Sequence, residues 1–371
     1  MDAIVVGGGV IGLTVAWRLA QRDAAVTVLD PDPGRAASQV AAGMLAPVAE
    51  VARGEDPVRA LSLASAARWP EFGAELARAS GADPGLTSSG TLIVARDGDD
   101  LGELNELLTL QTEVGLASER LSSRQARKLE PALAPSIRGA LWLPDDHQVD
   151  NRMLMEALGQ AARRSGVGFV EQPVDRVEAT SVTTADGTRL HADVVVVATG
   201  AWTPPVSTDE HPGGLPVRPI KGQIIRVEAT PDAVMPTRTV WGFDVYVVPR
   251  AHGEIVIGAT VEERGFDTSV TVGAVHELLR DAWQLVPGLS EARFVEAAAG
   301  LRPGTPDNLP IIGRVGADGP VVAVGHFRHG ILLAPVTADL VVGLVDGSLD
   351  AGDRALLAPF APERFDARAE P

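Results

Sequence analysis

The chain opens with short apolar runs separated by a glycine-rich turn and a stretch of helical spacing. Residues 3–6 are apolar, glycines follow at positions 7, 8, 9 and 12, and residues 10–22 carry apolar side chains at helical intervals. A second apolar run, 25–29, ends at Asp30. This order of strand, glycine turn, helix, strand and acid is typical of a dinucleotide-binding βαβ unit. It predicts a Rossmann-type domain at the N-terminus.

Later parts of the chain divide into two kinds of pattern. Helix and strand patterns alternate again over 150–198 and 321–345, whereas 219–294 alternates apolar and polar residues as half-buried antiparallel strands do. Residues 56–135 are expected to be mostly helical. The fold class predicted is α/β, with a discontinuous Rossmann-type domain and an α+β substrate domain that has a mostly antiparallel sheet. Crossings between the domains are expected at the prolines and glycines of 131–135 and 212–214.

Composition narrows the function. The 371 residues, 45% hydrophobic and 22% charged, are enough for two globular domains. A net charge of -17 disfavours nucleic acid and anionic lipid surfaces as partners. The absence of cysteine excludes disulfides, thiolate metal sites, a cysteine nucleophile and a sulfur-tethered flavin. No metal site is predicted.

The apolar segments do not favour a membrane location. The first twenty residues contain Asp2 and three consecutive glycines and lack a basic leader, which disfavours a signal peptide. The longest apolar stretch, 331–345, contains Pro335 and Asp339 and is short for a bilayer span. We therefore expect a soluble, cytoplasmic protein that does not bind membranes.

Each part of the glycine turn has a physical task in a dinucleotide site. Gly7 permits the tight turn, Gly9 lets the backbone approach a pyrophosphate, and Gly12 lets helix and strand pack closely. The phosphates would lie at the helix N-terminus, and Asp30 would accept hydrogen bonds from the adenosine ribose. An acid at this position disfavours a ribose 2′-phosphate, which leaves NAD or FAD. An ordinary glycine-rich turn is the alternative.

Four segments in order give the chain a family resemblance. They are AASQVAAGMLAPVAE (36–50), DVVVVATGAW (193–202), AGLRPGTPDNLPIIG (299–313) and VGHFRHGILLAP (324–335). Together they resemble glycine oxidases of the thiamine-biosynthesis type, in the D-amino acid oxidase superfamily of FAD-dependent oxidoreductases. The resemblance implies noncovalent FAD held by 1–55, 140–215 and 298–360, a substrate-binding domain formed by 56–139 and 216–297, and a tail at 361–371.

The same resemblance implies which residues contact FAD. The set comprises small, apolar and turn residues together with the segment before and at the start of the last long helix: Gly7, Gly9, Val10, Ile11, Gly12, Asp30, Pro31, Ala37, Ser38, Ala42, Gly43, Met44, Val174, Gly200, His326, Phe327, Arg328, His329, Gly330, Ile331 and Leu332.

Three side chains are implied in substrate binding. Arg302 matches the arginine that clamps the substrate carboxylate, a task suited to the planar guanidinium fork. Tyr246, the only tyrosine, matches the residue that caps this carboxylate, and Arg328 also approaches the substrate. The structural alternatives are a half-buried sheet aromatic for Tyr246 and a solvated turn for Arg328 and His329.

The implied reaction is oxidative deamination of glycine, with hydride passing from the α-carbon to flavin N5 and oxygen reduced to peroxide. No obvious catalytic triad is present, as expected if the neutral amine expels the hydride. The resemblance further implies glycine imine supply to thiazole synthase, and a homotetramer or other homo-oligomer. Val261 and His329 depart from common family residues, so sarcosine and small D-amino acids remain candidate substrates.

Three other functions stay open at this point. A D-amino acid dehydrogenase that reduces a quinone shares the Rossmann start and the substrate arginine. An FAD-dependent tRNA-modification domain is disfavoured by the net charge of -17. A flavin-binding regulator without turnover is disfavoured by the intact Arg302 motif.

Overall fold

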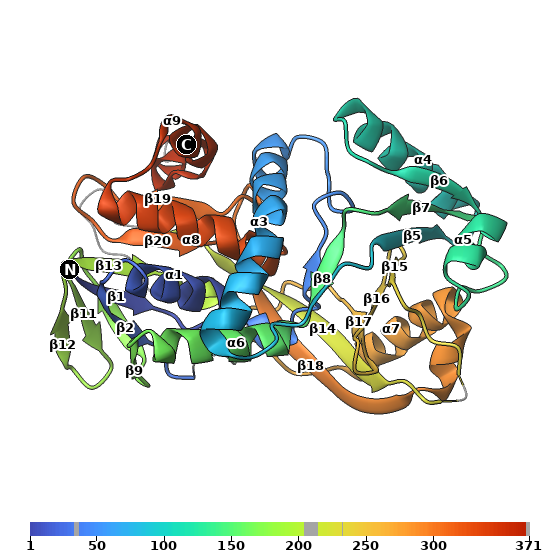
Figure 1. Ribbon diagram of the computed structural model, residues 1–371, viewed down its shortest axis with the longest axis horizontal. Coiled ribbons are helices and arrows are strands. Elements are labelled where there is room, and N and C mark those ends of the chain that lie inside the picture. Colours follow the sequence, from blue (N-terminus) through green and yellow to red (C-terminus); the bar gives the residue numbers. More distant parts are fainter. Residues whose placement is uncertain (33–36, 204–213, 232, 369–371) are drawn as a thin grey trace.

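The computed structural model of the protein describes residues 1–32, 37–203, 214–231 and 233–368. Figure 1 shows two parts, a smaller sheet with helices that contains the N-terminus and a larger sheet at the other end of the molecule. The long helix α3 (Asp56–Ser80) lies between them in this view. Residues 212 and 213 of one expected crossing fall outside the described residues, as does Ala36 of the first family segment.

The smaller sheet has six strands in the order β19-β20-β13-β1-β2-β9. All neighbours are parallel except β19 and β20. The strands are β1 (Asp2–Val6), β2 (Ala25–Leu29), β9 (Gly168–Val170), β13 (Val194–Val197), β19 (Ile311–Arg314) and β20 (Val321–Val324). Their continuous apolar sequences fit a parallel sheet covered on both faces. The predicted Rossmann-type α/β arrangement is therefore confirmed.

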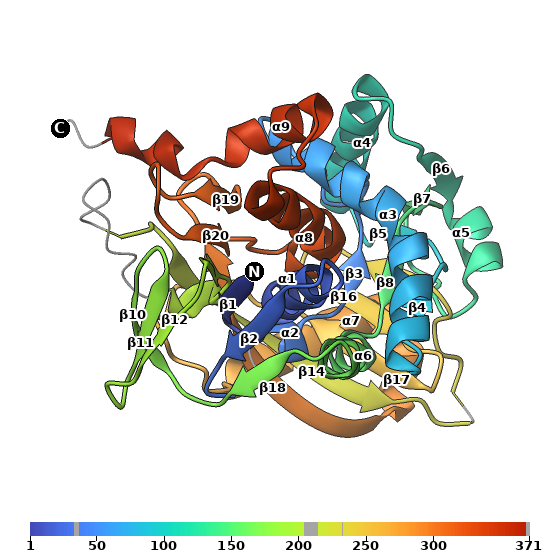
Figure 2. The ribbon, with the colours of Figure 1, turned by 60° about the vertical axis from the view of Figure 1, so that its left-hand side comes forward.

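Each face of this sheet has its own cover. Ala3 and Val5 pack with Trp17, Trp69 and other residues of the helices. These helices are α1 (Val10–Ala20), α3, α6 (Asn151–Arg164) and α8 (Gly330–Asp346). Ile4 and Val6 face a small antiparallel sheet of β10 (Val174–Val177), β11 (Ser181–Thr184) and β12 (Arg189–His191). Figure 2 shows this small sheet beside β1 and β2, on the side away from α1.

The larger sheet has eight strands in the order β18-β14-β17-β16-β15-β5-β7-β6. They are β5 (Thr91–Ala95), β6 (Glu119–Ser122), β7 (Gly139–Leu143), β14 (Arg218–Glu228), β15 (Thr239–Trp241), β16 (Tyr246–Pro249), β17 (Glu254–Gly258) and β18 (Arg293–Gly304). Only β15 and β5 pair in parallel, so the predicted mostly antiparallel sheet is confirmed. Helices α4 (Gly98–Glu113), α5 (Ser123–Leu129) and α7 (Val272–Leu285) pack against it.

The expected mostly helical stretch 56–135 is confirmed by α3, α4 and α5, but it also contains the strands β5 and β6. Strand β5 is buried at every position, so its sequence TLIVA shows no alternation that would distinguish it from a buried helical segment. Its pairing with β7 and β15, which lie far away in the chain, makes it a strand.

Shorter elements join the two parts. Strands β3 (Met44–Leu45), β8 (His147–Val149) and β4 (Leu86–Thr87) form a third antiparallel sheet. The others are α2 (Ala37–Val40), α9 (Ala351–Leu357) and the 3-10 helices η1 (Gly200–Trp202), η2 (Pro287–Glu291), η3 (Ala358–Phe360) and η4 (Pro362–Arg368). In the expected tail, Arg364 Nε donates to Asp307 Oδ2 at 2.9 Å, so this segment packs against the body.

Two of the expected domain boundaries lie inside strands of the larger sheet. Residue 140 is within β7, and residue 298 is within β18, which pairs with β14 along its whole length. We therefore propose that 140–143 and 298–304 belong with the substrate part. The β18 strand then carries its C-terminal residues from one part toward the other.

Among the described residues, no single helix has the length and apolar composition needed to cross a membrane. Only the pair Gly330–Asp346 and Ala351–Phe365, bent by 116°, reaches that length and composition when its two parts are combined.

The closeness of the glycine turn to α1 gives a test. A Cβ built on Gly12 would lie 1.9 Å from the Gly7 carbonyl oxygen, so Gly12→Ala should lower the free energy of unfolding by about 1–3 kcal/mol or more. Urea unfolding measures this. Gly102→Ala in α4 is the control, because a Cβ there meets no atom within 4 Å and helix propensity should stabilise it by up to about 1 kcal/mol. Equal stability of both variants would contradict the close-packing role.

Candidate functional site

One cavity of about 850 Å³ extends between the two parts of the molecule. Its lining comes from the glycine turn, the 37–44 loop, strands β14, β16 and β18 of the larger sheet, and the start of α8. The cavity brings together most of the residues expected to bind FAD or substrate: Gly7, Gly9, Val10, Ile11, Asp30, Pro31, Ala37, Ser38, Ala42, Gly43, Met44, Val174, Gly200, Tyr246, Arg302, His326, Phe327, Arg328, Gly330 and Ile331.

Three of the expected contacts do not line the cavity. Gly12 is packed against the Gly7 carbonyl, which leaves it a packing task. The Leu332 side chain is buried in the core, and its carbonyl accepts hydrogen bonds from Ser65 and Trp69 at 2.6 and 2.9 Å. His329 is also buried and turns toward Glu50. Packing therefore keeps these positions out of the cavity lining, and their contact with FAD stays a prediction.

Side-chain hydrogen bonds fix the backbone of the glycine turn. Asp30 accepts from the Gly8 N–H at 2.6 Å with one oxygen and from the Asp32 N–H at 2.8 Å with the other. Ser38 Oγ accepts from the Val10 N–H at 3.0 Å. Helix α1 therefore begins at the cavity, where its N-terminal dipole favours an anion. A pyrophosphate fits the start of α1 and the small residues around it, and a ribose fits the Asp30 carboxylate.

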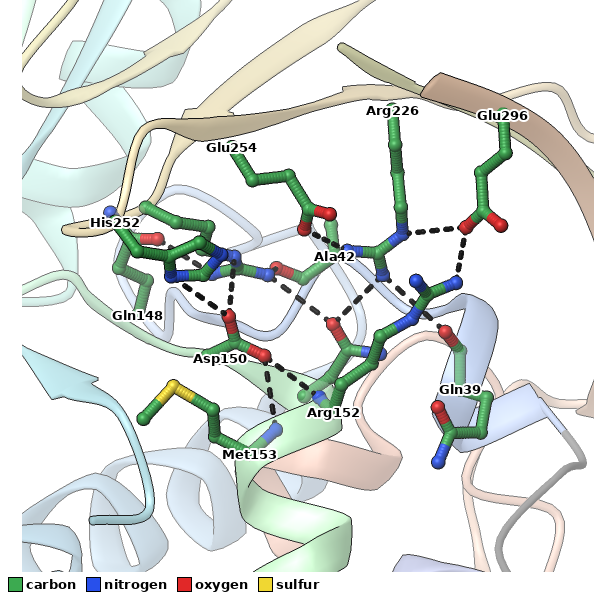
Figure 3. A network of polar contacts seen from close by, with 12 residues as sticks. Gln39, Ala42, Gln148, Asp150, Arg152, Met153, Arg226, His252, Glu254 and Glu296 are labelled. Atoms are coloured by element: carbon green, nitrogen blue, oxygen red, sulfur yellow. Dashed lines mark hydrogen bonds and ion pairs between the residues drawn. The ribbon is translucent and has the colours of Figure 1, made fainter. Parts of the chain in front are cut away.

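A buried polar network fixes the backbone of the 38–42 loop (Figure 3). Asn151 Nδ2 donates to the Ser38 carbonyl at 2.8 Å, and Arg226 Nη2 donates to the Gln39 carbonyl at 3.4 Å. Arg250 Nη2 donates to the Ala42 carbonyl at 2.6 Å. The donors come from α6, β14 and the residue after β16, so the larger sheet sets the loop that lines the cavity.

The two arginines of this network are themselves held by acids and amides. Arg226 is fully buried and ion pairs with Glu254 and with Glu296, the latter at 3.3 Å. Arg250 donates to Gln148 Oε1 at 2.7 Å, and its burial lowers its pKa to about 10. The sequence analysis did not single out either arginine. Their signal was a charge inside an otherwise apolar strand pattern, as in GQIIRVEA and VYVVPR.

Strand pairing makes room for Arg302 and Tyr246 at the other end of the cavity. A Cβ on Gly222 of β14 would lie 2.4 Å from Arg302 Nη1, and a Cβ on Gly258 of β17 would lie 2.5 Å from the Tyr246 hydroxyl oxygen. Each side chain therefore lies over a glycine of a neighbouring strand. Arg302 Nη1 also donates to the Thr260 carbonyl at 2.9 Å, which orients the guanidinium.

The electrostatic surroundings of Tyr246 contain charges of both signs. Burial raises the pKa of the Tyr246 phenol; the positive charge of Arg302 opposes this shift, and the negative charge of Glu50 adds to it. The phenol therefore stays protonated and can donate a hydrogen bond. The position of Tyr246 among cavity-lining residues favours the functional interpretation over an ordinary sheet aromatic.

Glu50 is a cavity residue that the sequence analysis did not assign. Its Oε2 lies 3.3 Å from Arg328 Nε and 3.5 Å from His329 Nδ1. The expected alternative of a solvated turn therefore does not describe His329, whose side chain is 6% exposed. Glu50 is the last residue of the first family segment, 36–50, and its acidic type at the end of a run of small residues was the available signal.

His326 lies at the junction of β20 and α8. Its Nε2 is 3.1 Å from Thr337 Oγ1, and the ring is buried. Burial lowers the pKa of His326 to about 3, with a smaller contribution from His329 in the same direction. The imidazole is therefore neutral at physiological pH.

This burial predicts a pH dependence of stability. The native imidazole stays neutral down to about pH 3, whereas the unfolded one takes up a proton below its ordinary pKa of 6.5. The free energy of unfolding should therefore fall with pH through this window, by up to about 1.4 kcal/mol per unit. Between pH 7 and 5 the wild type should lose roughly 2 kcal/mol more than His326→Asn in urea unfolding. His276→Asn, at an exposed position on α7, should retain the wild-type dependence. If the free energy of unfolding depended on pH in the same way in all three proteins, this role of His326 would be refuted.

Comparison with known proteins agrees with this geometry. Residues 2–344 match the family described as FAD dependent oxidoreductase. The chain is 35% identical over 370 residues to a glycine oxidase of Geobacillus kaustophilus, covering 98% of this chain and 97% of that protein. The crystal structure of glycine oxidase from that organism has a TM-score of 0.89 to this structure at 34% identity, covering 98% of both chains.

Two further relatives differ in length or in substrate. The bifunctional protein ThiO/ThiG of Synechocystis sp. is 35% identical over 376 residues, which cover 98% of this chain and 54% of that protein. The chain thus spans about half the length of this relative. The crystal structure of iminodiacetate oxidase from Chelativorans sp. has a TM-score of 0.84 at 26% identity, covering 97% and 98% of the two chains. The protein described here belongs to the FAD dependent oxidoreductase family, as its four motifs and its cavity predicted.

Proposed function

We propose that this protein is a glycine oxidase, which converts glycine, oxygen and water into glyoxylate, ammonia and hydrogen peroxide. The observation that carries the proposal is a continuous cavity that extends from the glycine turn and Asp30 to Arg302 and Tyr246. Its volume of about 850 Å³ is in the range of pockets that bind sizeable ligands. The glycine oxidase relatives align over almost the whole chain, which supports the same assignment.

The roles proposed for the residues follow from their chemistry. The donors of the glycine turn, Asp30 and the 37–44 loop hold FAD, which when bound supplies the acceptor for the hydride of the α-carbon. Arg302 binds the substrate carboxylate through its planar fork, and Tyr246 donates its hydroxyl hydrogen to the same group. Arg328 adds positive charge at the same end of the cavity.

The start of α8 supplies a second electrostatic effect. The helix begins at Gly330, and the cavity includes Gly330 and Ile331. The N-terminal dipole favours negative charge in the cavity next to it. The neutral His326 preserves this field without adding a titrating charge near neutral pH.

Substrate range is proposed to extend beyond glycine. Val261 lines the cavity and is 66% exposed, so it leaves the substrate end open. The similarity to iminodiacetate oxidase of Chelativorans sp. supports turnover of N-substituted glycines in this fold. Sarcosine and small D-amino acids are the candidates to test beside glycine.

The setting of the enzyme is also proposed from resemblance. We propose a cytoplasmic homo-oligomer, with a homotetramer as the first expectation, that supplies glycine imine to thiazole synthase. The bifunctional ThiO/ThiG relatives support a link to a second activity, since about half of their length aligns with this chain.

Oxygen uptake by the purified holoenzyme tests the function. Yellow protein that consumes oxygen with glycine, sarcosine or D-alanine and releases peroxide is the expected result. Reduction of a dye or quinone without oxygen uptake would identify a dehydrogenase instead. Colourless, well-folded protein that takes up no FAD would overturn the proposal.

Asp30 is expected to contribute to FAD binding. Asp30→Ala should weaken FAD retention at least about tenfold, because it removes a charged hydrogen-bond acceptor for the ribose and the anchor of the Gly8 N–H. Equilibrium dialysis followed by flavin absorbance measures the change. Asp175→Ala, at an exposed position of β10, is the matched control. Unchanged retention in Asp30→Ala would remove Asp30 from the nucleotide site.

Arg302 is expected to bind the carboxylate of the substrate. Arg302→Ala should raise the KM for glycine by roughly 100-fold or more with the flavin spectrum intact, because two charge-assisted hydrogen bonds to the carboxylate are lost. Arg176→Ala, at a 61% exposed side chain of β10, should leave KM unchanged. Normal glycine kinetics in Arg302→Ala would reject the carboxylate clamp.

A further inference from the structure

Glu50 places a carboxylate at the substrate end of the cavity. Its side chain is 13% exposed, while Oε2 is buried. The exposed part of Glu50 therefore belongs to other atoms of a side chain that lines the cavity. Among the described residues, no donor makes a hydrogen bond to Oε2, because the contacts with Arg328 and His329 have ion-pair distance without hydrogen-bond geometry.

The backbone before Glu50 is fixed in place. The buried carboxyl group of Asp146 accepts from the Val48 N–H and the Ala49 N–H, both at 2.9 Å. Asp146 lies between β7 and β8, so the larger sheet and the third sheet set the position of this segment. Glu50 is therefore presented to the cavity by a rigid support.

The other acids of the cavity lining are occupied elsewhere. Asp30 and Asp32 lie at the nucleotide end, where Asp30 holds the glycine turn. Asp244 ion pairs with Arg96 at 2.5 Å and is 62% exposed. Among the described lining residues, this leaves Glu50 as the acid at the substrate end that has no hydrogen-bond donor.

A free amino acid carries both charges near neutral pH, so its recognition needs a cation for the carboxylate and an acceptor for the amino group. Arg302, Tyr246 and Glu50 all line the same cavity, so a cation and an acceptor are both available to one bound amino acid. A carboxylate accepts a charge-assisted hydrogen bond from the ammonium group, and it can still accept a hydrogen bond from the neutral amine that expels the hydride.

We propose that Glu50 binds the amino group of the substrate, opposite the carboxylate clamp. The inference rests on the proposed amino acid oxidase function and deepens it. Glu50 then orients the α-carbon by holding the nitrogen, and it discriminates amino acids from carboxylic acids that lack an amine. The competing role is purely positional, in which Glu50 only holds Arg328 in place.

Glu50→Gln in the purified holoenzyme separates these roles, because the substitution removes the charge and keeps the size. The KM for glycine, or for the best amine substrate of the wild type, should rise roughly 10- to 100-fold. Acetate has the carboxylate but no amine, and its binding can be followed by its effect on flavin absorbance or as competitive inhibition. Its dissociation constant should stay within about twofold or fall, since the loss of a negative charge leaves Arg328 unneutralised.

Two matched measurements guard against trivial outcomes. Glu113→Gln removes a carboxylate from an exposed pair with Arg53 and should leave glycine and acetate binding unchanged. Flavin content and melting temperature of Glu50→Gln should match those of the wild type. Glu50→Asp keeps the charge on a shorter stem and should recover part of the glycine affinity. If Glu50→Gln does not fold, Glu50→Asp supports the proposal when it weakens glycine more than acetate.

The outcomes distinguish this inference from the function on which it rests. Equal weakening of glycine and acetate would assign Glu50 to the positioning of Arg328 and overturn the proposal. Unchanged glycine KM in Glu50→Gln would also overturn it. A wild-type holoenzyme that oxidises no amine would refute the proposed function itself, before any variant is compared.

Discussion

Two guanidinium groups buried in the larger sheet constrain the rest of the site. Arg226 and Arg250 have almost no exposed side-chain surface, and a buried guanidinium is costly unless its donors are satisfied. Their donors are met in part by the carbonyls of Gln39 and Ala42, which belong to the loop beside the cavity. These carbonyls satisfy one Nη2 donor of each arginine, and the two parts of the molecule are joined through these bonds.

The segment from Ser38 to Glu50 connects both ends of the cavity. Ser38 Oγ holds the first N–H of α1 at the nucleotide end. Ten residues after Ser38, the Val48 N–H, and next to it the Ala49 N–H, donate to the carboxyl group of Asp146. These bonds fix the backbone that presents Glu50 at the substrate end. A shift of this segment would move the nucleotide and substrate contacts together.

Glycines make the site possible by removing volume where strands meet. Gly222 and Gly258 give Arg302 and Tyr246 space over neighbouring strands, and Gly12 lets α1 approach the β1 turn. The length of β18 then matters, because one strand pairs with β14 from Arg293 to Gly304 and carries Arg302 to the cavity. Arg302 and Tyr246 thus lie on sheet positions, which favours their precise placement.

The sequence by itself determined the features that depend on local patterns. The glycine turn with Asp30, the parallel strand runs and the four family segments predicted the Rossmann-type fold, the FAD dependent oxidoreductase family and the elements that meet at the cavity, and the fold and family are confirmed. The roles of Arg302, Tyr246 and Arg328 stay predictions, although the structure brings these side chains to one cavity.

Only the tertiary structure decided which distant groups meet. Strand β5 could not be distinguished from a helix, because burial on both faces removes alternation. The tasks of Arg226, Arg250 and Glu50 depend on partners up to about 280 residues away, and the packing of His329 beside Glu50 keeps it out of the cavity lining. A local pattern reports what one segment prefers, whereas the satisfaction of a buried charge depends on which segments the fold brings beside it.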